Sequence, residues 1–173
     1  MGVVAVEQLA QHVAFGIIAV AATFGAIRVV TSNNVVHAAL YLVITLASVG
    51  ASFLLLGAEF TGITQVLVYI GAIVVLFLFG IMLTRAPIGA HVQLTGKTWV
   101  GGAVVAVGLL GVLSYTLMDA YGMQHVDEHT ALVPQTTSAV ADSIFRDYLV
   151  PFEVASVLLL AALIGAIVIA RKD

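Results

Sequence analysis

Five long apolar stretches limit what this chain can fold into. Each contains 19 to 25 residues with hardly a charge among them. An α-helix needs about 20 largely apolar residues to cross about 30 Å of hydrocarbon, because each residue adds about 1.5 Å. We therefore predict an all-α membrane protein with five transmembrane helices, over residues 12–30, 35–56, 60–84, 99–118 and 148–170.

The composition excludes several classes of protein. Of the 173 residues, 62% are apolar and 9% are charged, whereas a soluble domain is about a quarter charged. The six Lys and Arg residues form no run, so the basic surface that binds nucleic acid is absent. Because the sequence contains no cysteine, it forms no disulfide, thiolate-held iron–sulfur cluster or cysteine-based zinc site.

Polar turn signals separate the apolar stretches. Residues 31–34 read Thr-Ser-Asn-Asn, which predicts a tight turn and an N-cap for the second helix. Pro87 and Gly89 end the third stretch. The only long polar segment, 119–147, is predicted as a loop of a single membrane domain that covers residues 1–173. No Lys or Arg precedes the first stretch, so we expect a retained helix rather than a secretion signal.

The basic residues predict the direction of the helices. Alternating the sides of the connections gathers five of the six on one face of the membrane, namely Arg28, Arg85, Lys97, Arg171 and Lys172, and leaves Arg146 on the other. Lys and Arg are retained in the cytoplasm. The N-terminus is therefore predicted outside and the C-terminus in the cytoplasm, which makes 119–147 an external loop.

No ionisable side chain falls near the middle of a predicted span. Pumps and transporters keep such groups there despite their cost. Arg28, His37, Glu59, Arg85 and Glu153 all lie near span ends, where long side chains reach the interface.

Haem, metal and catalytic motifs are also missing. His12 and His37 lie at opposite ends of their spans and so cannot share a haem. His125 and His129, beside two acids, are interpreted as part of a solvated acidic loop rather than a metal site. No phosphate loop, dinucleotide fingerprint or nucleophile motif occurs. We expect no catalytic residue, no cofactor and no metal on this chain.

The third stretch differs from the others. Thr61, Gln65 and Tyr69 recur every four residues, which predicts a polar stripe on one face of its outer half. Gly71 follows, beside the branched residues 73–75. A glycine next to crowded branched residues favours an irregular turn, so we predict a π-bulge in helix three.

Helix three also resembles a known family. Residues 58–60, Ala-Glu-Phe, and 65–79, Gln-Val-Leu-Val-Tyr-Ile-Gly-Ala-Ile-Val-Val-Leu-Phe-Leu-Phe, look like the third helix of subunit J of respiratory complex I, the counterpart of mitochondrial NADH dehydrogenase subunit 6. The resemblance extends to residues 33–39 at the start of the second helix, and to 148–153 and 158–171 in the last.

This resemblance implies a membrane-arm subunit of proton-pumping NADH:quinone oxidoreductase that couples quinone reduction to proton translocation. FMN, iron–sulfur clusters and quinone would be bound by partner subunits. The implied partners are the quinone-site subunit, the small three-helix subunits A and K, and the antiporter-like subunits. A bacterial plasma membrane is favoured over an organellar inner membrane.

In this family the third helix can switch between a π-bulge and a regular α-helix, so the resemblance implies that 69–77 is the bistable stretch. Rotation below the bulge would change which apolar side chains, such as Val75 and Phe77, line a water path. Tyr69 is the first candidate for a proton path, with an interhelix packing bond as the alternative. Gly71 is the candidate for the bulge, with close helix packing as the alternative.

Three further polar side chains complete the candidate set. Gln65 belongs with Tyr69 on the expected proton path. Glu59 is a candidate for proton exit or a subunit interface, although a solvated charge at a helix start explains it equally. Glu153 follows Pro151, so helix-start chemistry is the alternative for it as well. The rival functional reading is a structural or ion-pathway subunit of a membrane-bound hydrogenase or of a multisubunit cation/proton antiporter.

Overall fold

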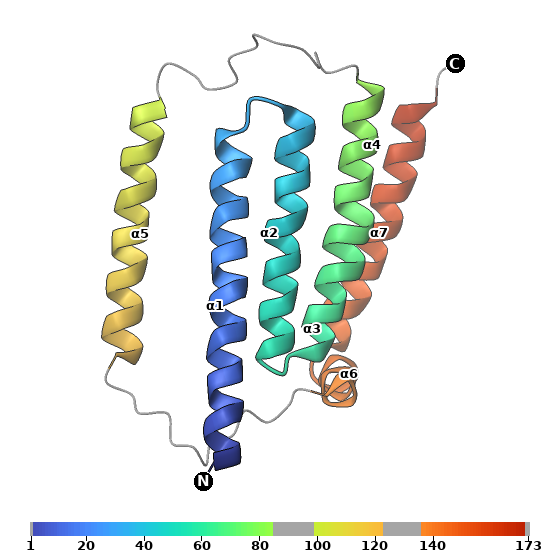
Figure 1. Cartoon of the computed structure of the whole chain (residues 1–173). Coiled ribbons are helices and arrows are strands. Elements are labelled where there is room, and N and C mark those ends of the chain that lie inside the picture. Colours follow the sequence, from blue (N-terminus) through green and yellow to red (C-terminus); the bar gives the residue numbers. More distant parts are fainter. Residues whose placement is uncertain (1, 85–98, 123–135, 172–173) are drawn as a thin grey trace. The chain divides into compact units, whose positions relative to one another are not determined.

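The computed structural model describes residues 2–84, 99–122 and 136–171. All regular elements within these ranges are helical (Figure 1): α1 (Gly2–Thr31), α2 (Val35–Leu55), α3 (Glu59–Thr64), η1 (Gln65–Val74), α4 (Val75–Leu83), α5 (Trp99–Tyr121), α6 (Thr137–Arg146) and α7 (Leu149–Ala170). Elements α3, η1 and α4 follow one another without a break, and together they form helix three.

Five helices are long and apolar enough to cross a membrane. They are Gln8–Thr31, Val35–Leu55, Glu59–Leu83, Trp99–Tyr121 and Leu149–Ala170. The prediction of an all-α protein with five transmembrane helices is therefore confirmed. The first helix begins at Gly2, before its predicted start at residue 12.

The chain forms two compact units, residues 1–133 and 134–173. In the first unit, α2 packs against α1 on one side and against helix three on the other (Figure 1). Asn34 caps α2, since its Oδ1 accepts hydrogen bonds from the backbone N–H groups of Val36 at 2.9 Å and His37 at 3.3 Å. This cap confirms the turn predicted from residues 31–34, because it satisfies backbone donors that the helix itself leaves free.

Glycine brings α1 and α2 close together. Gly25 is buried, and a Cβ atom on it would lie 2.6 Å from Oγ1 of Thr45 and 3.2 Å from the carbonyl oxygen of Tyr41. Directly before Gly25 on α1, the ring of Phe24 meets the ring of Tyr41 edge to face, with centroids 6.0 Å apart. In a membrane, helices associate through such close packing rather than through a hydrophobic driving force.

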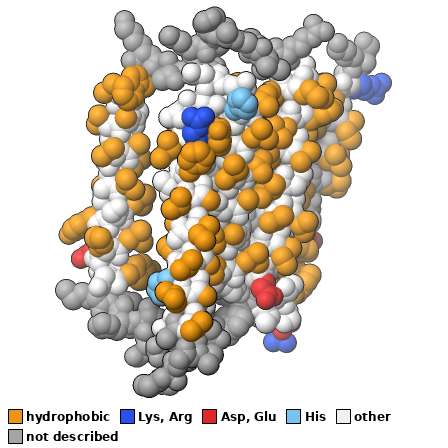
Figure 2. Space-filling model, viewed as in Figure 1, with side chains coloured by type: hydrophobic (Ala, Val, Ile, Leu, Met, Phe, Trp, Pro, Cys, Tyr) orange, Lys and Arg blue, Asp and Glu red, His pale blue; other side chains and the backbone are white. Residues whose placement is uncertain are grey.

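Most of the apolar surface of the chain is open. Figure 2 shows apolar side chains covering the visible helices, with charged side chains near helix ends. Neither α5 nor α7 contains a buried residue in the structure of the single chain. A Cβ atom on Gly101, Gly108 or Gly111 of α5 would meet nothing within 4 Å. These surfaces are suited to lipid and to the helices of neighbouring proteins.

The second unit contains a helix in a segment whose polar sequence predicts a loop. Within the segment 119–147, expected to be a loop, α5 continues to Tyr121 and residues 137–146 form α6. Thr136 caps α6, because its hydroxyl accepts a hydrogen bond from the N–H of Ala139 at 3.4 Å. The ring of Phe145 packs edge to face on Phe152 of α7, with centroids 5.4 Å apart. The segment is therefore partly helical, and α6 is anchored to the start of the last span.

Candidate functional site

Helix three changes its hydrogen-bond register twice. It starts as a regular α-helix of 6 residues, continues as a π-helix of 10 residues from Gln65 to Val74, and returns to α-geometry at Val75. The prediction of a π-type irregularity in this helix is confirmed. Its position differs from the expected stretch 69–77, because the π-helix begins at Gln65 and ends before Val75. Tyr69 and Gly71 lie inside it, whereas Val75 and Phe77 lie in the α-helix that follows.

The two ends of the π-helix are buried, and the first of them packs against α2. Gln65, its first residue, is 8% exposed, and Val74, its last, is 2% exposed. The Cγ atom of Gln65 lies 3.4 Å from the position that a Cβ atom would take on Gly50 of α2. The residues between them are mostly open, and Tyr69 is 48% exposed. The π-helix is therefore held at its ends and free along its outer side.

The expected polar stripe does not form a single face. Thr61 and Tyr69 are exposed, while Gln65, halfway between them, is buried against α2. A spacing of four returns to the same face only in an α-helix. In a π-helix each hydrogen bond reaches one residue further, so more residues fill each turn and Tyr69 is rotated away from Gln65.

Gly62 of α3, just before the π-helix, meets Gly50 of α2. A Cβ atom on Gly62 would lie 3.3 Å from the carbonyl oxygen of Gly50, and 2.8 and 2.9 Å from two side-chain carbons of Leu54. The chain turns between α2 and α3 at Gly57, whose φ of 73° is open to glycine at little cost. This crossing was not predicted from the sequence. The signal for it was small residues placed on both sides of a tight turn.

Of the two candidate acids, Glu59 lies in the first turn of its helix and Glu153 lies just after the first turn of α7. Glu59 is exposed in the first turn of α3, where its charge complements the helix dipole. Glu153 is exposed on α7, two residues after Pro151 in the first turn. Its carbonyl oxygen accepts a hydrogen bond from the hydroxyl of Ser156 at 2.7 Å.

The described residues were also compared with the requirements of a metal site. No three His, Asp or Glu side chains are grouped there so that they could hold a metal ion. The predicted loop cluster around His125 and His129 lies outside the described residues.

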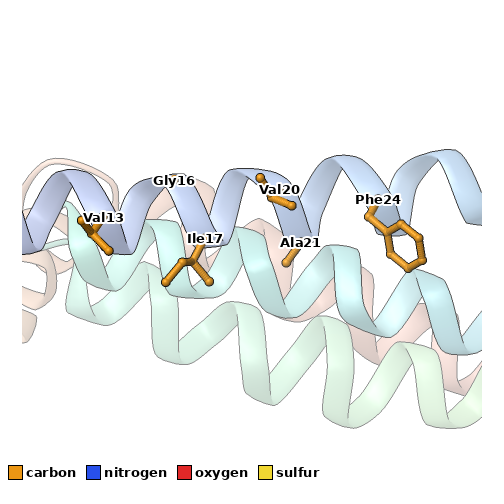
Figure 3. A pocket seen from close by; sticks show the side chains of 6 residues that line it. All are labelled: Val13, Gly16, Ile17, Val20, Ala21 and Phe24. Atoms are coloured by element: carbon orange, nitrogen blue, oxygen red, sulfur yellow. The ribbon is translucent and has the colours of Figure 1, made fainter.

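One open groove runs along α1 (Figure 3). It has a volume of about 540 Å³, and its described lining is apolar: Val13, Gly16, Ile17, Val20, Ala21 and Phe24. These side chains offer no hydrogen-bonding or titratable group. The groove suits an acyl chain or a neighbouring helix better than a substrate.

Comparison with known proteins places the chain among subunits of quinone oxidoreductases. A family model described as NADH-ubiquinone/plastoquinone oxidoreductase chain 6 matches residues 25–169. The chain is similar to NAD(P)H-quinone oxidoreductase chain 6 of Synechocystis sp., with 37% identity over 166 residues, 94% of this chain and 82% of that protein. It is 35% identical to NADH-quinone oxidoreductase subunit J of Escherichia coli over 91% of this chain and 84% of the relative. It is also 37% identical to F(420)H(2) dehydrogenase subunit J of Methanosarcina mazei, over 92% of this chain and 90% of that protein.

Proposed function

The chain belongs to the NADH-ubiquinone/plastoquinone oxidoreductase chain 6 family, and from this premise we propose that it couples quinone reduction to proton translocation without carrying a cofactor of its own. As a family member it is a multi-pass membrane subunit of NADH-quinone oxidoreductase. The coupling role goes one step further and rests on the geometry of helix three.

The π-helix from Gln65 to Val74 is the observation that carries this proposal. Well under 1% of residues in proteins adopt π-geometry, and it appears mostly as single turns at functional sites. A run of 10 residues is therefore a costly alternative to the regular α-helix. A return to the α-register would rotate everything that follows, and two packings of one element are what a switch requires.

The residues after the π-helix are placed to transmit such a rotation. Val75 is 58% exposed and Phe77 is 48% exposed, and α4 has no buried residue. Rotation of α4 would therefore exchange the side chains that it presents to a neighbouring subunit. We propose that this exchange opens and closes a water path along which Tyr69 offers its hydroxyl.

The chain contributes packing and water rather than charge to this mechanism. Between Glu59 and Arg85 the sequence has no charged residue. The proton-carrying acids would then belong to partner subunits, and so would FMN, the iron–sulfur clusters and the quinone. We propose the quinone-site subunit, the small three-helix subunits A and K, and the antiporter-like subunits as the partners, in a bacterial plasma membrane.

The electron donor is decided outside this chain. The relatives include subunits whose names specify NAD(P)H, NADH and F(420)H(2), at 35 to 37% identity. Mild detergent extraction and identification of the co-purifying proteins tests our assignment. Flavin and iron–sulfur proteins are expected. Hydrogenase subunits, or antiporter subunits alone, would replace the proposal with the rival assembly.

The coupling role itself is tested with Gly71→Leu. A Cβ atom on Gly71 would meet only the carbonyl oxygen of Val66, at 3.4 Å, so the larger side chain projects outward from the π-helix. In membrane vesicles containing the assembled complex, we expect proton pumping to fall more than NADH oxidation or assembly. Gly108→Leu is the matched control, because Gly108 lies in α5, outside helix three, and a Cβ atom there would meet nothing within 4 Å. An unchanged ratio of protons pumped to NADH oxidised in Gly71→Leu would contradict the proposal.

A further inference from the structure

Gln65 is a buried polar side chain with no hydrogen-bond partner among the described residues. It is 8% exposed, and only Ser48 accompanies it as a buried polar side chain in the described part of the chain. The Ser48 hydroxyl donates to the carbonyl oxygen of Ile44 at 2.9 Å, whereas the Gln65 amide makes no such bond within these ranges. An amide in a membrane without a partner is costly, so a partner from outside the chain is expected.

The amide is held near an opening rather than sealed inside. No fully enclosed side-chain nitrogen or oxygen in the described residues lacks a partner, so both amide atoms of Gln65 must reach the surface of the chain. The methylene part of Gln65 packs over Gly50, with 3.4 Å from Cγ to the Cβ position of that glycine. Any larger side chain on Gly50 would displace Gln65. The amide nitrogen of Gln65, a donor, and its amide oxygen, an acceptor, thus both lie at the surface where α2 and η1 cross.

Lipid cannot supply the hydrogen bonds that the Gln65 amide lacks. Gln65 lies six residues after Glu59, which is about 9 Å deeper along the helix at about 1.5 Å per residue. A short amide side chain at that depth does not reach the headgroups, and acyl chains form no hydrogen bonds. A water molecule both donates and accepts, and it is small enough for a residue that is more than nine-tenths covered.

Polar side chains lie along helix three between its start and the Gln65 amide. Thr61 is exposed one turn before Gln65, and Thr64 is half-buried beside it. The Thr64 hydroxyl donates to the carbonyl oxygen of Phe60 at 2.8 Å, which leaves its own oxygen free to accept. Beyond Gln65, Tyr69 is the only hydrogen-bonding side chain before Thr84. Gln65 is therefore the deepest of the closely spaced polar residues of 59–65, and Tyr69 alone follows it.

We propose that the Gln65 amide binds water at the crossing of α2 and η1, in a hydrated site that opens toward the Glu59 end of helix three. The ligand class is water, and the polar segment from Glu59 to Gln65 is its route of entry. A role for this water in proton transfer rests on the coupling function proposed above. It locates water one turn before Tyr69, at the first residue of the π-helix.

The absence of cysteine from the sequence makes a direct test available. In the assembled complex, Gln65→Cys is compared with Leu67→Cys, a site at nearly the same depth that is 66% exposed on the single chain. A membrane-impermeant cationic methanethiosulfonate attacks the thiolate, which forms in water and not in hydrocarbon. We expect Gln65→Cys to react roughly tenfold faster or more, as measured by the mass of this subunit, because only this thiol can ionise in contact with water. Equal, slow reaction at both sites would overturn the water site and indicate a protein partner or lipid instead.

Radiolytic footprinting of the unsubstituted complex provides a second measurement if Gln65→Cys does not assemble. Hydroxyl radicals formed from bound water oxidise adjacent side chains, so Val66 should be oxidised faster than Leu76 of α4. Equal rates at the two positions would overturn the proposal. Both measurements are made without NADH. Their failure would leave the pumping test of Gly71→Leu intact, and an unchanged pumping ratio would leave the labelling result standing.

Discussion

The carbonyl oxygen of Gly50 lies 3.3 Å from the position that a Cβ atom would take on Gly62, so α2 and α3 meet backbone to backbone. This contact lies directly before the π-helix, whereas α4 after it has no buried residue. The π-helix is thus held at both ends, whereas α4, the helix that follows it, is loosely packed in this chain. A change of register in the π-helix is therefore expected to move α4 and to leave α3 in place.

The contact between α2 and α3 predicts a steric effect at Gly62. In Gly62→Ala the new methyl group would lie 2.8 and 2.9 Å from Leu54 carbons, as well as against the Gly50 carbonyl. Overpacking of this kind costs about 1–3 kcal/mol. We expect the complex to release this subunit at a lower temperature, as measured on native gels after stepwise heating.

A second substitution identifies the cause. Leu54 is 50% exposed, so Leu54→Ala alone should have a small effect. In the double variant it removes the two shortest contacts but not the contact with the Gly50 carbonyl, so part of the lost stability should return. Full stability of Gly62→Ala alone would show that α2 and α3 are not in close contact.

The sequence was sufficient to predict the spans but not their internal geometry. Long apolar stretches and the polar turn at 31–34 are local signals, and the Asn34 cap formed as expected. The position of the π-helix was anticipated near Gly71, but its start at Gln65 and its length of 10 residues were not. Each hydrogen bond of a π-helix spans one residue more than that of an α-helix. Packing against neighbouring helices selects between the two registers more than composition does.

Helix α6 and the crossing of Gly50 and Gly62 have only weak signals in the sequence. Helix α6 has Val140, Ala141 and Ile144 half-buried on one side, and Asp142 exposed on the other. That pattern is typical of an amphipathic helix, but 10 residues inside a polar segment gave a short window in which to recognise it. The glycine crossing could not be predicted, because it joins residues on two helices whose relative rotation is a tertiary property.

The end of the α1–α2 pair that carries Arg28 provides another prediction. Nη2 of Arg28 donates to the Tyr41 hydroxyl at 3.3 Å, and Cζ of Arg28 lies 4.9 Å from the centre of the Tyr41 ring. Tyr41→Phe removes the hydrogen bond, worth about 0.5–1.5 kcal/mol, and keeps the ring. Tyr41→Leu also removes the cation–π contact, worth about 0.5–1 kcal/mol at an exposed site, and the edge contact with Phe24. Tyr41→Leu should therefore lower the subunit-release temperature more than Tyr41→Phe. Equal losses would mean that the ring contributes no stability.

The direction of the chain in the membrane can be tested at the two ends of α2. This helix has 21 residues, enough to span the hydrocarbon, so its ends lie on opposite sides. Asn33 is exposed in the turn after α1, near Arg28, and Leu56 is 57% exposed at the other end, near Glu59. Because basic residues are retained in the cytoplasm, the Asn33 end is expected inside and the Leu56 end outside.

Single cysteines at these positions report the side directly, since the chain has no cysteine of its own. An impermeant thiol reagent should label Leu56→Cys in right-side-out vesicles and Asn33→Cys only in inside-out vesicles, and both after detergent treatment. This orientation would make the Glu59 end of helix three, and with it the water route to Gln65, open to the outer side where pumped protons leave. The reverse labelling pattern would place that route on the cytoplasmic side, so the water bound at Gln65 would then lie on the uptake half of the path.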